Sequence, residues 1–237
     1  MKILAFGDVH APKFLSILID SLKKTNTDSI SLVLIAGDIV EKGNYPMCKP
    51  VVNALSRVKP GATIVAVFGN EDYPDVRDKL REECPEITWL DDNYINLDFD
   101  EKITIVGTTG VLDRPTRWQL RNIPDVRGQY NRRITRIEAM LNEIPHGRLT
   151  VLLTHYPPRC RTLVGEREEF WEEMSSAKLA EIIRRRPVNA VVHGHLHKSQ
   201  VYRDFIGLTP VYNVALPAVG GVTTIEVKPV GLEGWFA

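Results

Sequence analysis

Short, nearly continuous runs of apolar residues recur along the chain and are rich in β-branched side chains. Such runs are typical of strands that are buried on both faces of a sheet. We therefore expect strands at Ile3–Phe6, Leu32–Ile35, Ile64–Phe68, Ile103–Val106, Leu149–Leu153, Ala190–Val192, Val211–Val214 and Val222–Val227.

Apolar residues return at helical spacing between the early strand candidates. This spacing predicts helices at Phe14–Lys24, Pro50–Val58 and Asp75–Cys84, and Pro74 directly before the third favours a helix start there. Strands that alternate with helices are typical of layered α/β folds in which the sheet is largely parallel.

The last two strand candidates, Val211–Val214 and Val222–Val227, have no long helix between them. They are separated only by Pro217 and the Gly220-Gly221 pair. Parallel neighbours need a long crossover connection, so we expect an antiparallel arrangement here, with the last strand at a sheet edge.

An arginine-rich segment, Val111–Gly147, separates two strand candidates by far more than an ordinary loop. We expect a helix in it that ends near Ile144. We interpret the segment as an insertion in a single domain that spans residues 1–237. A further helix is expected from about Ser175 to Arg184–Arg186, because cations suit a helix C-terminus.

The composition places the chain among ordinary globular proteins. Of its 237 residues 43% are hydrophobic and 25% are charged, and 30 basic residues balance 30 acidic ones. This excludes a disordered, coiled-coil or uniformly basic protein. The three cysteines are far apart, and neither a secretory signal nor a membrane-spanning run is visible, so we expect a cytoplasmic protein without a membrane partner.

Polar side chains that can bind metals follow five of the predicted strands. They are Asp8 and His10, then Asp38, Asn70 and His155, and finally His195 and His197. The carboxyl ends of strands line the ligand crevice of open α/β sheets. Glycines before Asp38, Asn70 and His195 allow sharp turns and leave room for an ion or a phosphate. His193, by contrast, is expected to lie in the core or to support a ligand rather than to bind metal itself.

The donor atoms of this set are oxygens and imidazole nitrogens, without a thiolate. Such donors suit manganese, iron, zinc or nickel, and we favour manganese. Seven ligands are too many for one tetrahedral ion but enough for two ions that share a carboxylate. Two such ions can promote the attacking and leaving steps of a phosphoryl transfer.

Five short blocks, in this order, resemble those of the calcineurin-like metallophosphoesterase superfamily. They are Asp8-Val-His10, Gly37-Asp38, Gly69-Asn70, His155 and Gly194-His195-Leu196-His197. The resemblance implies an α/β fold of the metallophosphoesterase type, a four-layer α/β/β/α sandwich. The residues around His155, Thr154–Pro158, look most like the small prokaryotic branch related to cyclic-nucleotide phosphodiesterases.

The same resemblance implies how the metal ligands are shared between two ions. Asp8, His10 and His197 would hold the first ion, Asn70, His155 and His195 the second, and Asp38 both. A hydroxide between the ions would attack phosphorus in line with the leaving group. Asp38 and Asn70 would then be catalytic residues as well as ligands.

The third block departs from the family pattern, in which a histidine follows Gly-Asn. Here Glu71 takes that place and Asp72 follows. A carboxylate beside two cations is held ionised, so Glu71 would be a poor acid and would repel a dianionic monoester. We therefore predict a phosphodiesterase that prefers good leaving groups, with Glu71 in the catalytic group. Alternatively, Glu71 is a metal ligand or orients one, and Asp72 orients an imidazole or lies on the surface.

Substrate contacts are expected from Asn70, Arg114, Arg117 and Arg159, although the arginines suit a salt-bridged surface equally well. The favoured partner is a small phosphoester such as a nucleotide. A nuclease and a weakly active or non-catalytic interaction module of the same fold stay open as alternatives, as does a homo-oligomer. Nucleic acid is the less favoured partner, because the chain is neutral overall.

Overall fold

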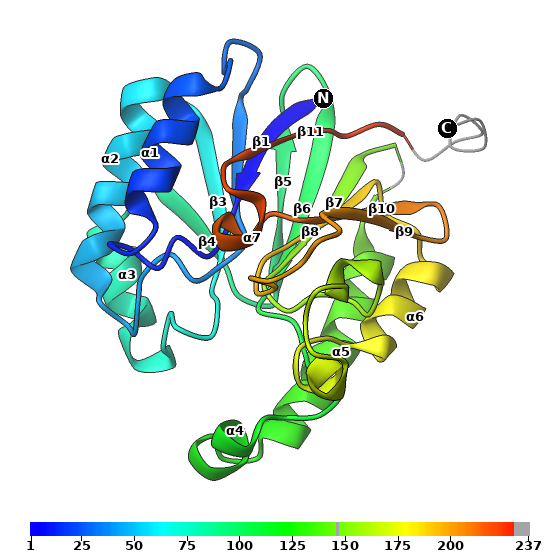
Figure 1. Cartoon of the computed structure of the whole chain (residues 1–237). Helices are drawn as coiled ribbons and strands as arrows, with labels where there is room; N and C mark the ends of the chain where they lie inside the picture. The colour runs from blue at the N-terminus through cyan, green and yellow to red at the C-terminus, as the bar shows by residue number, and fades with distance from the viewer. Residues whose placement is uncertain (146, 230–237) are drawn as a thin grey trace.

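A computed structural model describes residues 1–145 and 147–229 and contains two sheets (Figure 1). The first sheet has the order β11-β1-β2-β3-β4, and the second has the order β5-β6-β7-β8-β10-β9. Strands of the first sheet are β1 (Lys2–Phe6), β2 (Leu32–Ile35), β3 (Thr63–Val67), β4 (Ile87–Leu90) and β11 (Thr223–Glu226). Strands of the second are β5 (Asn93–Asp98), β6 (Lys102–Thr108), β7 (Leu149–Thr154), β8 (Ala190–His193), β9 (Arg203–Ile206) and β10 (Thr209–Asn213).

Helices cover the outer face of each sheet (Figure 1). The first sheet is covered by α1 (Leu15–Lys24), α2 (Cys48–Val58) and α3 (Arg77–Glu83), and the second by α5 (Val126–Glu143) and α6 (Ala177–Arg185). Two short helices, α4 (Arg117–Asn122) and α7 (Leu216–Val219), lie outside these layers. Single 3-10 turns occur at Tyr45–Met47, Pro74–Val76, Arg161–Leu163 and Glu168–Glu173.

The continuous apolar runs are explained by cores on both faces of each sheet. In β1, Leu4 and Phe6 pack toward the helices, while Ile3 and Ala5 pack into a core between the sheets. Successive strand residues point to opposite faces, so a strand between two cores has mostly apolar positions. The four layers α/β/β/α follow, as the family resemblance implies.

All eight predicted strands are present, but β4, β5 and β9 are additional to the prediction. These three strands all lie at sheet edges. Edge strands are partly exposed, and β5 and β9 carry charged and polar residues, so neither has a continuous apolar run.

The last two predicted strands were expected to be antiparallel to each other, and this is wrong, because they belong to different sheets. β10 runs parallel to β8 and antiparallel to β9. β11 crosses to the first sheet, where it pairs antiparallel with β1 and forms an edge.

Two helices with different roles lie in the segment 111–147. Helix α5 buries Ile137 and Met140 against the second sheet, so its apolar stripe belongs to the outer core. Helix α4 instead projects beyond the layers (Figure 1). Among residues 1–145 and 147–229, no helix is both long and apolar enough to cross a bilayer.

Candidate metal centre

The predicted ligands come together where strands of both sheets end. The loops after β1, β2 and β3 carry Asp8, His10, Asp38 and Asn70, and the loops after β7 and β8 carry His155, His195 and His197. Side chains separated by up to 189 positions in the chain thus meet beside the interface between the sheets.

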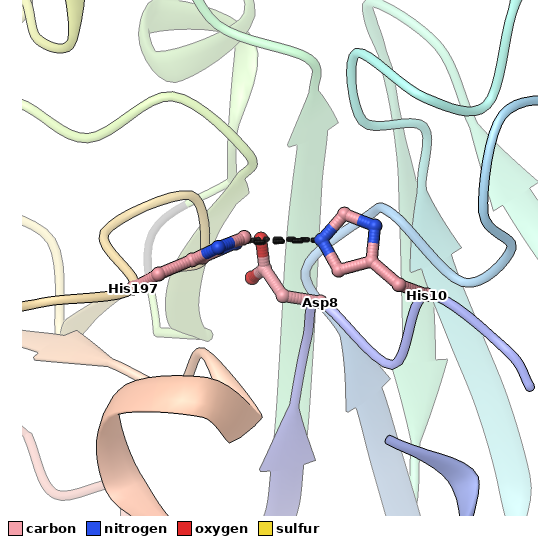
Figure 2. Close-up of side chains that lie close together, drawn as sticks. All are labelled: Asp8, His10 and His197. Atoms are coloured by element: carbon pink, nitrogen blue, oxygen red, sulfur yellow. Dashed lines mark hydrogen bonds and ion pairs between the residues drawn. The ribbon is translucent and has the colours of Figure 1, made fainter. Parts of the chain in front are cut away.

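Asp8, His10 and His197 form the first group of donors (Figure 2). The Nε2 atom of His197 lies 2.8 Å from Asp8 Oδ1 and 3.4 Å from His10 Nε2. The His10 Nε2 atom lies 3.8 Å from the same Asp8 oxygen. Three oxygen and nitrogen donors that lie this close together form a group that could hold one divalent ion.

Asp8, Asp38 and His155 form a second group, and the donor atoms of each group lie within 4.8 Å of one another. Asp38 Oδ2 lies 3.7 Å from His10 Nε2 and 3.5 Å from His155 Nε2, so it faces both groups. Asn70 Oδ1 lies 2.9 Å from His155 Nε2.

His195 approaches the centre in a different way. Its backbone N–H donates to both carboxylate oxygens of Asp8, at 3.1 and 3.0 Å. Its ring packs edge-on against His155 and Tyr156, with centroid distances of 5.0 and 4.8 Å. The structure therefore places His195 next to the second group while its main chain positions a ligand of the first.

Glycines allow the ligand loops to approach one another closely. A Cβ on Gly37 would lie 2.8 Å from His155 Nδ1, and this residue has a φ of +85°. A Cβ on Gly194 would overlap the carboxylate of Asp8. The room that these glycines leave is thus occupied by ligand side chains.

Four proposed ligands have left-handed backbone conformations that side chains rarely adopt. The φ angles are 57° at Asp8, 40° at His10, 50° at Asp38 and 71° at His195. Each costs on the order of 1–3 kcal/mol and persists only where its surroundings impose it, typically at a functional site.

Among the described residues, no lysine or arginine side chain pairs with the two buried carboxyl groups of the centre. Asp8 and Asp38 are 0% and 1% exposed. Burial and the charges of Asp72 and Asp8 hold the pKa of Asp38 well above its usual range. Burial disfavours the Asp8 carboxylate too, but the His197 hydrogen bond and neighbouring imidazoles lower its pKa to about 2.

Three of the four proposed imidazole ligands are held in the neutral form that binds metals, whereas, despite burial, the hydrogen bond with Asp8 raises the pKa of His197. Burial lowers the pKa of His10, His155 and His195. His155 Nδ1 lies 2.9 Å from the carbonyl oxygen of Ala36, which directs Nε2 toward the centre. Buried carboxylates that lack a cation, together with neutral imidazoles, fit divalent ions.

Glu71 contacts a proposed ligand. Its Oε2 atom lies 3.2 Å from His10 Nδ1 and accepts a bond from the backbone N–H of Lys42 at 3.0 Å. A carboxylate on Nδ1 fixes the ring and leaves Nε2 for the metal. This geometry favours the alternative in which Glu71 orients a ligand.

Asp72 is fully buried and binds backbone rather than an imidazole. Its Oδ2 accepts N–H groups of Asp38 and Gly69, both at 2.8 Å, and its Oδ1 accepts that of Val40 at 3.4 Å. It therefore joins the loop after β2 to the loop after β3. Sequence reasoning missed this role, and the only signal was an acid two residues after a proposed ligand.

His193 lies in the core, as predicted. It is fully buried, with its Nε2 atom 3.1 Å from Thr162 Oγ1 and its Nδ1 atom 2.8 Å from the carbonyl oxygen of Gly194. Burial lowers its pKa to about 4, so the ring is neutral at pH 7.

Two of the three arginines expected to bind substrate have acidic partners. Arg114 Nε lies 3.1 Å from Glu173 Oε1. Arg159 Nη2 lies 3.0 Å from Asp113 Oδ2, an ion pair without hydrogen-bond geometry. Arg117 is exposed on α4. Their contact with substrate stays a prediction.

Comparisons with solved structures show which proteins share this fold. The chain is 16% identical to a phosphopantetheinyl hydrolase from Mycobacterium tuberculosis, with a TM-score of 0.71 and 96% of each chain covered. It is 14% identical to the TT1561 protein of Thermus thermophilus, with a TM-score of 0.59 and 96% of this chain and 99% of that one covered. It is 12% identical to a dimetal phosphatase from Danio rerio, with a TM-score of 0.54. The match covers 90% of this chain and 86% of that one.

The comparison with curated proteins gave no match. The family model described as calcineurin-like phosphoesterase matches residues 1–199, which include every proposed metal ligand. With this match and the fold and donor groups above, the chain belongs to the calcineurin-like phosphoesterase family.

Proposed function

We propose that this protein is a dinuclear-metal-dependent phosphodiesterase that hydrolyses small phosphodiesters. The observation that carries the proposal is the pair of donor groups, Asp8-His10-His197 and Asp8-Asp38-His155, which share one buried carboxylate. Asp38 faces both groups and would join the two ions. Asn70 and His195 stand beside the second group and would complete it.

Two divalent ions, when bound, would supply the charge that makes water a nucleophile at neutral pH and that neutralises the phosphoryl oxygens. The chain itself holds the donors in place before substrate arrives. Asp38 and Asp8 are fixed by backbone N–H groups of Glu71 and His195, and His10 is fixed by the Glu71 side chain. Hydrolysis replaces the bond between phosphorus and the leaving oxygen with a bond to water oxygen.

Glu71 is the reason for preferring a diester with a good leaving group. Its carboxylate contacts His10 and accepts a hydrogen bond from the N–H of Lys42, so it is engaged as a hydrogen-bond acceptor and not as a proton donor to the leaving group. The leaving oxygen would then take its proton from solvent, which favours acidic leaving groups. A second negative charge on phosphorus, as in a monoester, would be repelled.

The comparisons support the reaction class in a general way. One similar structure is described as a hydrolase and another as a dimetal phosphatase. At 16% and 12% identity these likenesses concern the fold alone. The choice between diester and monoester rests on Glu71.

The test begins with metal analysis of the purified protein, followed by hydrolysis of bis(p-nitrophenyl) phosphate and p-nitrophenyl phosphate with added manganese. We expect about two metal ions per chain and faster turnover of the diester. Asp38→Ala should lose metal and activity together, while Asp28→Ala, a change of an exposed aspartate, should not.

Other results would point to the alternatives. Cleavage of oligonucleotides without cleavage of small diesters would favour a nuclease. A protein that neither binds metal nor turns over either ester would favour an interaction module. A Glu71→His variant that gains nothing on poorly activated esters would contradict the reasoning about Glu71.

A further inference from the structure

A cleft of about 780 Å³ adjoins the metal centre. Asn70 and His195 line one part of it. The rest runs between Tyr73–Arg77, after β3, and helix α4 with the residues that follow it. A cleft of this size exceeds what a phosphoryl group needs, so it has room for an organic substituent of the substrate.

Both arginines that line the cleft are already neutralised. Arg77 Nη1 lies 3.2 and 3.0 Å from the two carboxylate oxygens of Asp91. Arg133 Nε lies 2.9 and 2.8 Å from those of Asp92, and its Nη1 donates to a backbone carbonyl. Neither guanidinium has the open fork that binds a phosphate or a carboxylate.

The remaining fixed charges on the cleft wall are acidic. They belong to Glu71, Asp75 and Glu173, of which Glu173 is paired with Arg114. A ligand with further negative charges, such as a polyphosphate or a nucleic acid, would meet repulsion here without a compensating cation.

One wall of the cleft is apolar and held in place. Trp118, Ile123 and Pro124 belong to it, and Trp118 is 61% exposed. Helix α4 starts with a capping box, and the side-chain amide of Gln119 donates to the hydroxyl of buried Tyr156 at 3.1 Å. The exposed indole of Trp118 therefore offers an apolar surface that is already fixed in position before a ligand binds.

A buried hydroxyl in the cleft also lacks a partner. Thr109 is 5% exposed, it lines the cleft, and its Oγ1 atom makes no hydrogen bond with any described residue. Buried hydroxyls are ordinarily hydrogen-bonded, because an unpaired one costs free energy. The Oγ1 atom itself is buried beneath the lining, so a ligand group would pair with it after a rotation of the Thr109 side chain toward the cleft.

We infer that this cleft binds the organic substituent of the phosphodiester, and that it selects a substituent that is uncharged and partly apolar and has a hydrogen-bonding group for Thr109. The inference rests on the proposed function, because the phosphoryl group must lie at the metal centre. It specifies the substrate class more closely, and it disfavours nucleic acids and nucleoside polyphosphates.

The test uses phosphonate ligands with poor leaving groups, which carry one negative charge on phosphorus and differ in one arm. Methylphosphonate monoesters carrying ethyl, 2-phenylethyl, 2-hydroxy-2-phenylethyl or 2-(4-carboxyphenyl)ethyl groups are titrated calorimetrically into the manganese-loaded protein. We expect the phenyl group to tighten binding about tenfold over ethyl, which is about 1.4 kcal/mol. The hydroxyl should tighten binding a further few-fold over the phenyl ligand. The carboxylate should weaken binding about tenfold relative to the phenyl ligand.

Variants with matched controls test which residues cause the increases in affinity from the phenyl and hydroxyl groups. Trp118→Ala should abolish the phenyl gain, whereas Leu120→Ala, a change of an exposed residue on the same helix that does not line the cleft, should preserve it. Thr109→Val should abolish only the hydroxyl gain, and Thr109→Ser should keep it.

Hydrolysis of bis(p-nitrophenyl) phosphate is measured on the same samples. Absence of metal binding and turnover would overturn the proposed function and the inference with it. An active enzyme with equal affinity for the ethyl and phenyl ligands, or with tighter binding of the carboxylated arm or of a DNA oligonucleotide, would overturn the inference alone.

Discussion

Removing Asp72 tests whether a buried carboxylate outside the ligand set holds the metal centre together. In an Asp72→Ala variant the backbone N–H groups of Asp38 and Gly69 lose an acceptor at 2.8 Å, and that of Val40 loses a weaker one at 3.4 Å. Because each buried, unsatisfied donor costs about 1–3 kcal/mol, the two short bonds together represent about 2–6 kcal/mol.

Two effects bring the expected loss to the lower part of that range. Burial raises the pKa of Asp72 to about 6, so the variant also removes an unfavourable buried charge. Water can enter the space that the side chain leaves. We therefore expect the free energy of unfolding to fall by about 2–4 kcal/mol, and metal affinity to fall about 10–100-fold, because the Asp38 loop loses its support.

The assay is urea unfolding of the metal-free protein, followed by calorimetric titration with manganese. Asp72→Asn is the control, because its amide oxygen can accept the same two short hydrogen bonds without a charge. It should unfold within about 1 kcal/mol of the parent protein. If the alanine variant is as stable as the asparagine variant and binds manganese equally well, the hydrogen bonds of Asp72 do not position the centre.

Four further results are expected. Glu71→Ala should weaken manganese binding about tenfold by freeing the His10 ring, and Glu71→Gln should weaken it less, as measured by calorimetry. Arg117→Ala should change kcat/KM for bis(p-nitrophenyl) phosphate less than about twofold, because this side chain does not line the cleft, and a larger loss would assign it to substrate binding. Phe68→Ala should cost about 3–5 kcal/mol in urea unfolding, since the ring stacks on Trp89 at 4.5 Å, whereas Phe68→Leu should cost less. Manganese at about one hundred times its dissociation constant should raise the thermal midpoint by about 5–10 °C, and a chelator should reverse the rise.

The clustering of the proposed ligands could be predicted from the sequence, because each of them lies in a loop that follows a strand identified by the apolar pattern. A chain that leaves a sheet at its carboxyl edge has little freedom in where its next side chain lies. The positions of Asp8, Asp38 and His155 followed from this local rule. The α/β class followed from the alternation of apolar strands and helices, and the four-layer arrangement followed from the family resemblance.

Other features could not be predicted, because they depend on contacts between segments that are distant in the sequence. Nothing in the sequence distinguishes Asp72 from other acidic residues, because its role depends on contact between the loops after β2 and β3. The apolar stripe of α5, including Ile137 and Met140, is hidden among arginines that suggest a surface insertion. The acidic partners of Arg114 and Arg159 are likewise visible only in the fold.

The division of the ligands between the two sheets has a consequence for metal preference. Asp8 and Asp38 follow strands of the first sheet, and His155 and His197 follow strands of the second. The distance between donors therefore depends on how the sheets rest on each other through side chains such as Leu34 and Val151. Larger or smaller side chains in this inner core would change the distance between the donor atoms of the two sheets without altering any proposed ligand. Substitutions between the sheets would therefore shift the preference of the centre among ions of different radius.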